Sequence, residues 1–275
     1  MNLKQGPRAG IDSGETPMTE QSCKHSVTIV ICAFNEERTI GTVIGKVRTL
    51  DYVSEILILN NGSVDGTQQK IDEAVEGDAR CRVLRVEKNL GLGGGIRMLF
   101  TESSGDIVAR QDADLEYDPD ELFSLVEQID NGTADVVYGS RFLVRRAHRV
   151  HYFYNYIANK LLSFISNVLT NKFISDVETA VKAFNGPILR SLTLHSTGFE
   201  IENELTMKLS AAGCEFYEVP ISYYGRNYAE GKKIRWHDGI RALWYIFFYW
   251  IVAYGGKSKL PKVAGMRIGK RSDSF

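Results

Sequence analysis

The hydrophobic positions in the first half of the chain form short continuous runs rather than helical stripes. Five such runs are rich in β-branched and aliphatic residues: Val27–Ala33, Glu55–Leu59, Cys81–Val86, Asp106–Gln111 and Ala134–Gly139. Continuous apolar runs of this length are typical of strands buried on both faces of a parallel sheet. Strand, polar turn and helical segment recur four times, which predicts a right-handed βαβ sheet with polar residues gathered at one rim.

The pattern changes after Arg141. Hydrophobic residues from Tyr152 to Thr170 recur at helical spacing and form an aromatic and aliphatic face. A further helix is expected from about Glu200 to Ala212, followed by a strand at Glu215–Val219 and a last helix from about Asp238. The second half of the chain is therefore expected to be mainly helical.

The last helix contains an unbroken apolar run, Leu243–Ala253, that is dense in Trp and Tyr. The run is too short to span a bilayer, which needs roughly 20 residues. It fits a helix of the protein core or, because a basic tail follows it, a helix that lies on a membrane surface, which we favour. We therefore divide the chain into a disordered leader (1–25), an α/β domain (26–236), an aromatic amphipathic helix (237–256) and a basic tail (257–275).

Composition limits the classes of function. Of the 275 residues, 44% are hydrophobic and 24% are charged, as in an ordinary globular protein. The formal net charge of −1 gives no case for nucleic-acid binding. The charge is uneven, because the segment between Asp135 and Asp176 holds several cations and no acid. The cysteines are scattered without a CxxC spacing, which fits a reducing compartment.

The main chemical signal is a pair of carboxylates, Asp112 and Asp114, directly after the fourth run. Side chains at i and i+2 of an extended segment point the same way, so both can reach one point beyond the strand end, where open α/β sheets bind ligands. Carboxylate oxygens suit a hard divalent cation that is shared with a ligand's phosphates. The alternative for these residues taken by themselves is a solvated acidic turn.

The glycine-rich stretch from Gly91 to Gly95 does not indicate a dinucleotide site. Its spacing is not a clean GxGxxG, and it follows the third strand. We expect a loop that allows a close backbone approach between a strand end and the next helix. Whether Gly91 also lines a nucleotide pocket stays open.

Several motifs resemble, in order and spacing, those of glycosyltransferase family 2, and within it the dolichol-phosphate-mannose-synthase-like branch. They are Ile31–Glu37, Asn60–Thr67, Gln111–Asp114, Gly139–Phe142, Asp176–Thr179, and Glu218–Arg226 with Gly231–Lys233. The resemblance runs from about Val27 to Tyr249. It implies a GT-A fold, with a mostly parallel Rossmann-like sheet flanked by helices and a helical acceptor-side, membrane-proximal portion. It also implies an inverting hexosyl- or N-acetylhexosaminyl-transferase.

The resemblance also implies roles for individual residues. Those that would border the donor nucleotide sugar are Ala33, Phe34, Glu36, Asn61, Gly91, Asp112, Ala113, Arg226, Lys232 and Lys233. Asp112 and Asp114 would form the DxD pair that holds Mg²⁺ or Mn²⁺, with Asp114 as the direct ligand and Glu116 as a third ligand. Arg226, Lys232 and Lys233 would close over the negative charge of the leaving diphosphate.

The sequence departs from the family at three places. Cys32 stands where the family usually has Pro, Phe34 where it has Tyr, and Asn60–Asn61 where it has one or two Asp. An Asn can still accept a hydrogen bond from a base, though without the help of a charge. The identity of the base, in a UDP- or a GDP-sugar, therefore stays open.

The acceptor decides whether the reaction needs a base. A sugar hydroxyl must lose its proton, and Asp176 and Glu178 are then the candidate bases. A lipid phosphate is already anionic and needs cations to position it. Arg141 and the basic residues at 145, 146 and 149 match that need.

Three functions follow as hypotheses. The preferred one is a peripheral enzyme on the cytoplasmic face of a membrane, reached through the C-terminal helix and basic tail, that moves a sugar from a nucleotide sugar to a polyprenyl phosphate. The second is a soluble family 2 glycosyltransferase that acts on a saccharide or small-molecule hydroxyl. The third is a non-catalytic nucleotide-sugar-binding protein, supported only by Asn60–Asn61. The sugar, the metal, the acceptor's chain length and the oligomeric state do not follow from the sequence.

Overall fold

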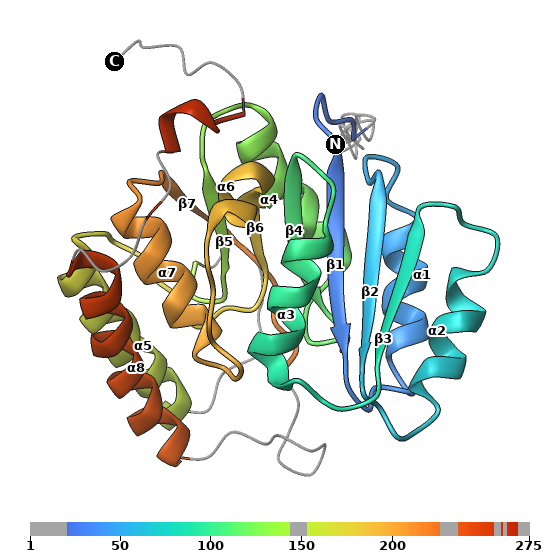
Figure 1. Cartoon of the computed structure of the whole chain (residues 1–275), viewed down its shortest axis with the longest axis horizontal. Helices are drawn as coiled ribbons and strands as arrows, with labels where there is room; N and C mark the ends of the chain where they lie inside the picture. Colours follow the sequence, from blue (N-terminus) through green and yellow to red (C-terminus); the bar gives the residue numbers. More distant parts are fainter. Residues whose placement is uncertain (1–20, 144–152, 226–235, 256–259, 261–262, 269–275) are drawn as a thin grey trace, which may run out of the picture.

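The computed structural model describes residues 21–143, 153–225, 236–255, 260 and 263–268. Within them, a sheet of seven strands runs through the molecule in the order β3-β2-β1-β4-β6-β5-β7 (Figure 1). Its strands are β1 (Val27–Ala33), β2 (Glu55–Asn61), β3 (Cys81–Val86), β4 (Ile107–Asp112), β5 (Val136–Ser140), β6 (Lys182–Asn185) and β7 (Phe216–Pro220). The pairs are parallel except at β6, which is antiparallel to β4 and β5. The predicted α/β fold with a mostly parallel sheet is confirmed.

The strand β6 is missing from the predicted elements. It has four residues, begins with Lys182 and follows no long apolar run, so the hydrophobic pattern does not mark it. Its neighbours in the sheet nevertheless cover it on both sides, and the Lys182 side chain is buried. Tertiary pairing, rather than local composition, makes this segment a strand.

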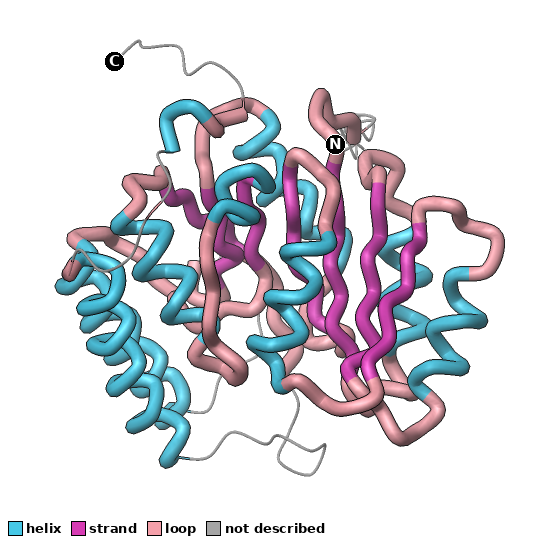
Figure 2. The backbone as a smooth tube through the Cα atoms, in the orientation of Figure 1, coloured by secondary structure: helices cyan, strands magenta, loops and turns pink. Residues whose placement is uncertain are grey.

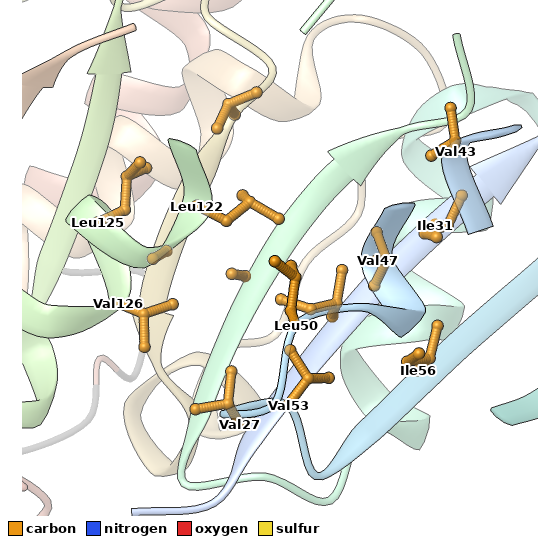
Figure 3. Close-up of a cluster of buried hydrophobic side chains, with 14 of the residues drawn as sticks. Val27, Ile31, Val43, Val47, Leu50, Val53, Ile56, Leu122, Leu125 and Val126 are labelled. Atoms are coloured by element: carbon orange, nitrogen blue, oxygen red, sulfur yellow. The ribbon is translucent and has the colours of Figure 1, made fainter. Parts of the chain in front are cut away.

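Helices cover both faces of the sheet (Figures 1 and 2). One layer consists of α1 (Ile40–Arg48), α2 (Thr67–Val75) and α4 (Leu122–Asp130), and the other of α3 (Gly91–Glu102), α6 (Gly186–Ser191) and α7 (Ile201–Ala211). Alternate residues of a strand serve opposite layers: in β1, Ile29 and Ile31 contact the first and Val30 the second. Figure 3 shows part of the first layer, with Val43 and Val47 over the sheet. Both faces are therefore buried, as the continuous apolar runs predict.

Two further helices, α5 (Phe153–Thr170) and α8 (Trp236–Tyr254), lie side by side at one flank of the molecule (left in Figure 1). They pack on α7 through a smaller apolar cluster that includes Leu162, Met207 and Ile246. The indole Nε1 of Trp250 in α8 donates to the carbonyl oxygen of Leu169 in α5 at 3.0 Å. This pair is the expected helical portion beside the sheet. Neither these nor the other described helices combine the length and apolar character that a membrane span requires.

At both ends of the α/β domain, described residues beyond the predicted boundaries contact it. Residues 1–20 of the expected leader lie outside the described residues, but the backbone N–H groups of Lys24 and His25 each donate to Asp130 Oδ1 at 3.0 Å. The folded domain therefore begins before residue 26. Most of the basic tail also lies outside the described residues. In its described part Val263 is buried and Arg267 forms an ion pair with Asp135 at 3.1 Å, so this part packs on the domain.

Candidate active site

The carboxyl ends of β1, β2 and β4 meet at one edge of the sheet, and the strand register places several expected site residues there. Cys32 of β1 pairs with Asp112 of β4, and Ala33 pairs with Asn60 of β2. The side chain of Asp112 is 28% exposed, whereas Ala33 is buried. Because ligands of open α/β sheets bind beyond the carboxyl ends of the strands, this rim is the candidate active site.

Asp114 lies two residues beyond the end of β4 and is 9% exposed. One of its carboxylate oxygens, Oδ1, accepts a hydrogen bond from the N–H of Glu116 at 3.1 Å. The Glu116 carboxylate lies beside Tyr223, and together with burial of the phenol it raises the pKa of Tyr223. No three metal-binding side chains gather within the described part of the chain. Asp112 and Asp114 could hold a divalent ion that takes its other oxygen ligands from a diphosphate and water.

The turn after β1 is connected to the carboxylate pair through Thr39. The hydroxyl of Thr39 lies 3.0 Å from Glu36 Oε2 and 3.0 Å from the carbonyl oxygen of Ala113, the residue between the two carboxylates. The N–H of Glu36 donates to Thr67 Oγ1 at 2.8 Å, which joins the turn to the start of α2. Phe34, just before this turn, is partly exposed. The structure therefore brings the expected nucleotide-site residues of the β1 turn and of the DxD segment together.

Asn61 holds the start of α3 in place. Its Nδ2 donates to Asn89 Oδ1 at 3.2 Å and to the carbonyl oxygen of Gly91 at 3.1 Å, while its Oδ1 accepts from the N–H of Leu90 at 3.0 Å. An Asp has no donor and could make neither of the first two hydrogen bonds. Asn60 is likewise engaged within its own turn and helix. The departure from the family at these two positions thus has a structural explanation.

The glycines of the 91–95 stretch lie in the first turns of α3 rather than in an expected loop before it. Gly91 has φ +76°, and a Cβ there would lie 2.2 Å from the carbonyl oxygen of Thr197. A Cβ at Gly93 would meet carbonyls of the same segment at 2.8 Å, and one at Gly95 would lie 2.7 Å from Cys32 Sγ. The predicted close approach to a strand end occurs at Gly95. At Gly91 and Gly93 the missing Cβ instead allows a close approach of residues 196–198, which are distant in sequence.

Arg141 and Asp176, which the sequence predicts as separate candidates, form one buried ion pair. Arg141 follows directly after β5, and its Nε and Nη2 each lie 2.7 Å from a carboxylate oxygen of Asp176. Asp176 has no exposed surface, and the guanidinium lies 5.4 Å from the ring centre of Tyr223. Burial opposes the charge of Arg141, but the neighbouring Asp176 outweighs it and raises the pKa of Arg141 further above its ordinary value.

Glu178 differs from Asp176 in its surroundings. It is partly exposed, and Asn203 of α7 donates to its Oε1 at 3.2 Å. The part of its carboxylate that is buried and the charge of Glu202 raise the pKa of Glu178 from an ordinary 4.5 to about 7. Glu178 can therefore take up a proton near neutral pH, as a general base must.

A buried charge cluster behind Asp112 is absent from the predicted site. It consists of Arg110 in β4, Lys182 in β6 and Glu202 in α7. One signal for it exists in the sequence, because Arg110 interrupts an apolar strand two residues before Asp112 and so shares its face. The other two members of the cluster could not be predicted from the sequence. The strand of Lys182 was not predicted, and α7 is buried on nearly every side despite its charges. The predicted cations Arg226, Lys232 and Lys233, and those at 145, 146 and 149, lie outside the described residues.

A mostly parallel sheet, one antiparallel strand beside the carboxylate-bearing strand and a helical flank together define an α/β enzyme of the GT-A class. The family model for glycosyl transferase family 2 matches residues 28–185, more than half of the chain. The chain belongs to this family, and the protein is a glycosyltransferase. The non-catalytic hypothesis rested on Asn60 and Asn61 and has lost that support.

Individual relatives refine this assignment. The polyprenol monophosphomannose synthase of Mycolicibacterium smegmatis is 26% identical over 227 residues, 80% of this chain and 85% of that protein. The dolichol-phosphate mannosyltransferase of Pyrococcus furiosus is 27% identical over 213 residues, 75% of this chain and 58% of that protein. Similarity to these proteins places the chain in the dolichol-phosphate-mannose-synthase-like branch.

Solved structures show the same fold. The glucosyl-3-phosphoglycerate synthase of Mycobacterium tuberculosis, in complex with Mn²⁺, UDP and glucosyl-3-phosphoglycerate, matches this chain with a TM-score of 0.63. The match covers 86% of this chain and 81% of that one, at 19% sequence identity. At this identity the likeness concerns the architecture, and it confirms the predicted GT-A fold.

Proposed function

We propose that the protein moves a sugar, with inversion, from a UDP- or GDP-sugar to a polyprenyl phosphate at a membrane surface. The observation that carries this proposal is an exposed apolar face on α5 and α8, since α5 also contacts the segment of the expected acceptor residues. The names of the sequence relatives, which include polyprenol- and dolichol-phosphate mannosyltransferases, agree with it.

Large apolar side chains of α5 and α8 are exposed to solvent. Among the most exposed are Phe153 (67%), Tyr154 (83%), Phe164 (64%), Val168 (65%), Trp244 (69%) and Ile251 (55%). Each helix buries its opposite side against α7, so the exposed sides form an outer face of the molecule. Exposed apolar side chains gathered on one face mark an interaction surface. Its mixture of aromatic and aliphatic residues suits the interfacial layer of a bilayer.

The side of α5 next to this face contacts the segment that carries the expected acceptor residues. Ser163 of α5 accepts from the N–H of Val177 at 3.1 Å, and Lys160 of α5 donates to the carbonyl oxygen of Ser175 at 3.3 Å. The ring of Tyr156 lies 5.2 Å from that of Phe142, the residue after Arg141. A lipid tail on α5 would therefore place its phosphate near Arg141, which Asp176 holds in a fixed orientation.

On the donor side, Asp112 and Asp114 would hold the Mg²⁺ or Mn²⁺ ion, while Ala33, Phe34 and Glu36 would border the nucleotide. When bound, the ion would act as a Lewis acid that neutralises the charge on the leaving diphosphate. The Mn²⁺ and UDP bound to the mycobacterial synthase of the same fold support this assignment.

A second candidate is transfer to a hydroxyl group. One observation favours it: Glu178 is partly exposed and has a pKa of about 7, as a general base requires. Asp176 is less suited to that role, because it is buried and both of its carboxylate oxygens already bind Arg141. A phosphate acceptor needs no base, so the two candidates differ in their dependence on Glu178.

The test is a turnover screen over UDP- and GDP-sugars with Mn²⁺, each with and without a short polyprenyl phosphate. Nucleotide release that depends on both the lipid and Asp114 would support the proposal and identify the donor, with Asp114→Ala as the control. Release that ignores the lipid would favour a hydroxyl acceptor and direct attention to Glu178. No release from any donor, by a folded protein, would contradict both candidates.

A further inference from the structure

The buried charge cluster behind the rim is centred on Glu202 of α7. One carboxylate oxygen of Glu202 pairs with Arg110 Nη1 and the other with Lys182 Nζ. The side chains of Glu202, Arg110 and Lys182 are 5%, 2% and 1% exposed. Burying charges in this way is costly, and hydrophobic residues of similar volume would often be no less stable. The stability of the fold therefore does not by itself account for the cluster.

Arg110 connects this cluster to the candidate metal site. Its Nη2 donates to Asp112 Oδ1 at 3.1 Å, while its Nη1 faces Glu202. Arg110 and Asp112 are two residues apart in β4 and so lie on the same face of the strand. The guanidinium has a planar fork of donors, which lets it bridge two carboxylates in a fixed geometry. Arg110 thereby holds one oxygen of the partly exposed Asp112 and restricts how the other oxygen can turn.

The other side of the cluster reaches the acceptor segment. Lys182 Nζ also donates to the carbonyl oxygen of Val177 at 3.0 Å. Asn203, the neighbour of Glu202 in α7, donates to Glu178. The contacts of Arg110 and Lys182 with Glu202 thus connect Asp112 at the donor side to Val177 at the acceptor side, and Asn203 makes a separate contact with residue 178.

We propose that Arg110 is a positioning residue that, anchored by Glu202, orients the Asp112 carboxylate for binding of the divalent cation with the donor nucleotide. The inference rests on the proposed metal role of Asp112 and Asp114. Groups that hydrogen-bond to metal-ligating carboxylates fix the direction of their oxygens, and their loss weakens metal binding. Arg110 itself would not touch the cation, because it carries the same sign of charge.

The test compares Mn²⁺ binding by the full chain and by Arg110→Lys. Lysine keeps the positive charge but lacks the fork, so it cannot bridge Asp112 and Glu202 in the same geometry. Binding is measured from the electron paramagnetic resonance signal of free Mn²⁺, in the presence of UDP and separately of GDP. We expect the half-saturating Mn²⁺ concentration to rise about tenfold, the lower part of the range for groups that support metal ligands.

Lys208→Met is the matched control. Lys208 and Glu204 form another buried pair in α7, with Lys208 Nζ 2.6 Å from Glu204 Oε1, and neither contacts Asp112. We expect this variant to lose thermal stability but to bind Mn²⁺ like the wild type. Should Arg110→Lys not fold, Glu202→Gln, of the same shape, removes the anchor and is expected to weaken Mn²⁺ binding in the same direction.

The possible results distinguish a failure of the positioning role of Arg110 from a failure of the proposed metal site. Weaker Mn²⁺ binding in Arg110→Lys, with unchanged binding in Lys208→Met, would support the positioning role. Unchanged or tighter binding in Arg110→Lys, or an equal loss in Lys208→Met, would overturn it. A folded wild type that binds no Mn²⁺ with either nucleotide would refute the proposed metal site, and the positioning role with it.

Discussion

Asp176 accepts hydrogen bonds from two side-chain nitrogens of Arg141, each at 2.7 Å, and from the backbone N–H of Arg141 at 3.1 Å. The contacts join the end of β5 to the segment after α5, 35 residues further along the chain. Asp176 is buried, and the side chain of Arg141 is 11% exposed. The pair therefore fixes the direction of a guanidinium directly after the end of β5.

Replacement of Asp176 by Asn should destabilise the protein. The variant leaves the buried Arg141 without a compensating charge, and breaking such a pair typically costs roughly 3–5 kcal/mol. Urea denaturation would measure the loss. Glu73→Gln is the control, because Glu73 forms a half-exposed pair with Lys70, and no measurable change is expected there. Equal stability of Asp176→Asn and the wild type would contradict the structural role.

Glu178 should make stability depend on pH. Its pKa is raised from 4.5 to about 7 by burial and by the charge of Glu202. Between these values the folded state holds a proton that the unfolded chain has lost, so the free energy of unfolding falls as pH rises through this window. Glu178→Gln cannot titrate, and its pH dependence should be flatter. Denaturation of both proteins at about pH 5 and about pH 8 would show the difference.

The same variant distinguishes the two acceptor classes. If a hydroxyl is the acceptor and Glu178 the base, Glu178→Gln should lose roughly 10²–10⁴-fold in rate. The wild-type rate should then rise with an apparent pKa of about 7. With a polyprenyl phosphate as acceptor we expect Glu178→Gln to keep most of its activity, because no proton has to be removed. A large loss with the lipid acceptor would argue against the proposed mechanism.

The double variant Phe164→Ser with Trp244→Ser should weaken binding to vesicles that contain anionic lipid. Burial of one large apolar side chain is worth roughly 1.5–3 kcal/mol, so a loss of at least about tenfold is expected. The melting temperature should hardly change, since the two side chains are 64% and 69% exposed. Val64→Ser, 89% exposed in the turn after β2, should bind vesicles like the wild type. Co-sedimentation with the vesicles would measure all three proteins.

Two Gly→Ala changes in helices should have opposite effects. Gly91→Ala places a Cβ at φ +76° and 2.2 Å from the carbonyl oxygen of Thr197, so the variant must distort the start of α3. A positive φ costs roughly 1–2 kcal/mol by itself, and the contact adds to it. Gly45 in α1 has nothing within 4 Å of an added Cβ, and Gly45→Ala should stabilise by roughly 0.5–1 kcal/mol. Thermal melting that shows the same sign for both variants would contradict this account.

The strands that could be predicted from the sequence are those whose local hydrophobic pattern follows from their burial in the sheet. β1 and β2 are buried on both faces, so nearly every residue is apolar and the run is visible without knowledge of the fold. β6 is equally central in the sheet but short, and Lys182 within it is stabilised by a partner on α7. A buried lysine has a polar sequence signature whatever its location, so no local pattern could have identified this strand.

The candidate site likewise has features that could be predicted from the local sequence and others that could not. Asp112 and Asp114 were predictable because a strand end fixes the direction of residues i and i+2, and the rim of a parallel sheet follows from the repeated βαβ pattern. The pairing of Arg141 with Asp176 was not, although each was a candidate, because the sequence does not show which side chains compensate each other. Asn61 is a candidate nucleotide contact, and the sequence does not show that its amide also binds the start of α3.

The sequence by itself determined the places of the first strands along the chain, the position of the carboxylate pair and, through its motifs, the family. These depend on local periodicity and on residues close together in the chain. Only the tertiary structure decided the antiparallel β6, the cluster of Arg110, Lys182 and Glu202, and the shared outer face of α5 and α8. Each of these depends on charges or apolar surfaces that compensate one another across distant segments, and such partners are chosen by the fold rather than by sequence neighbours.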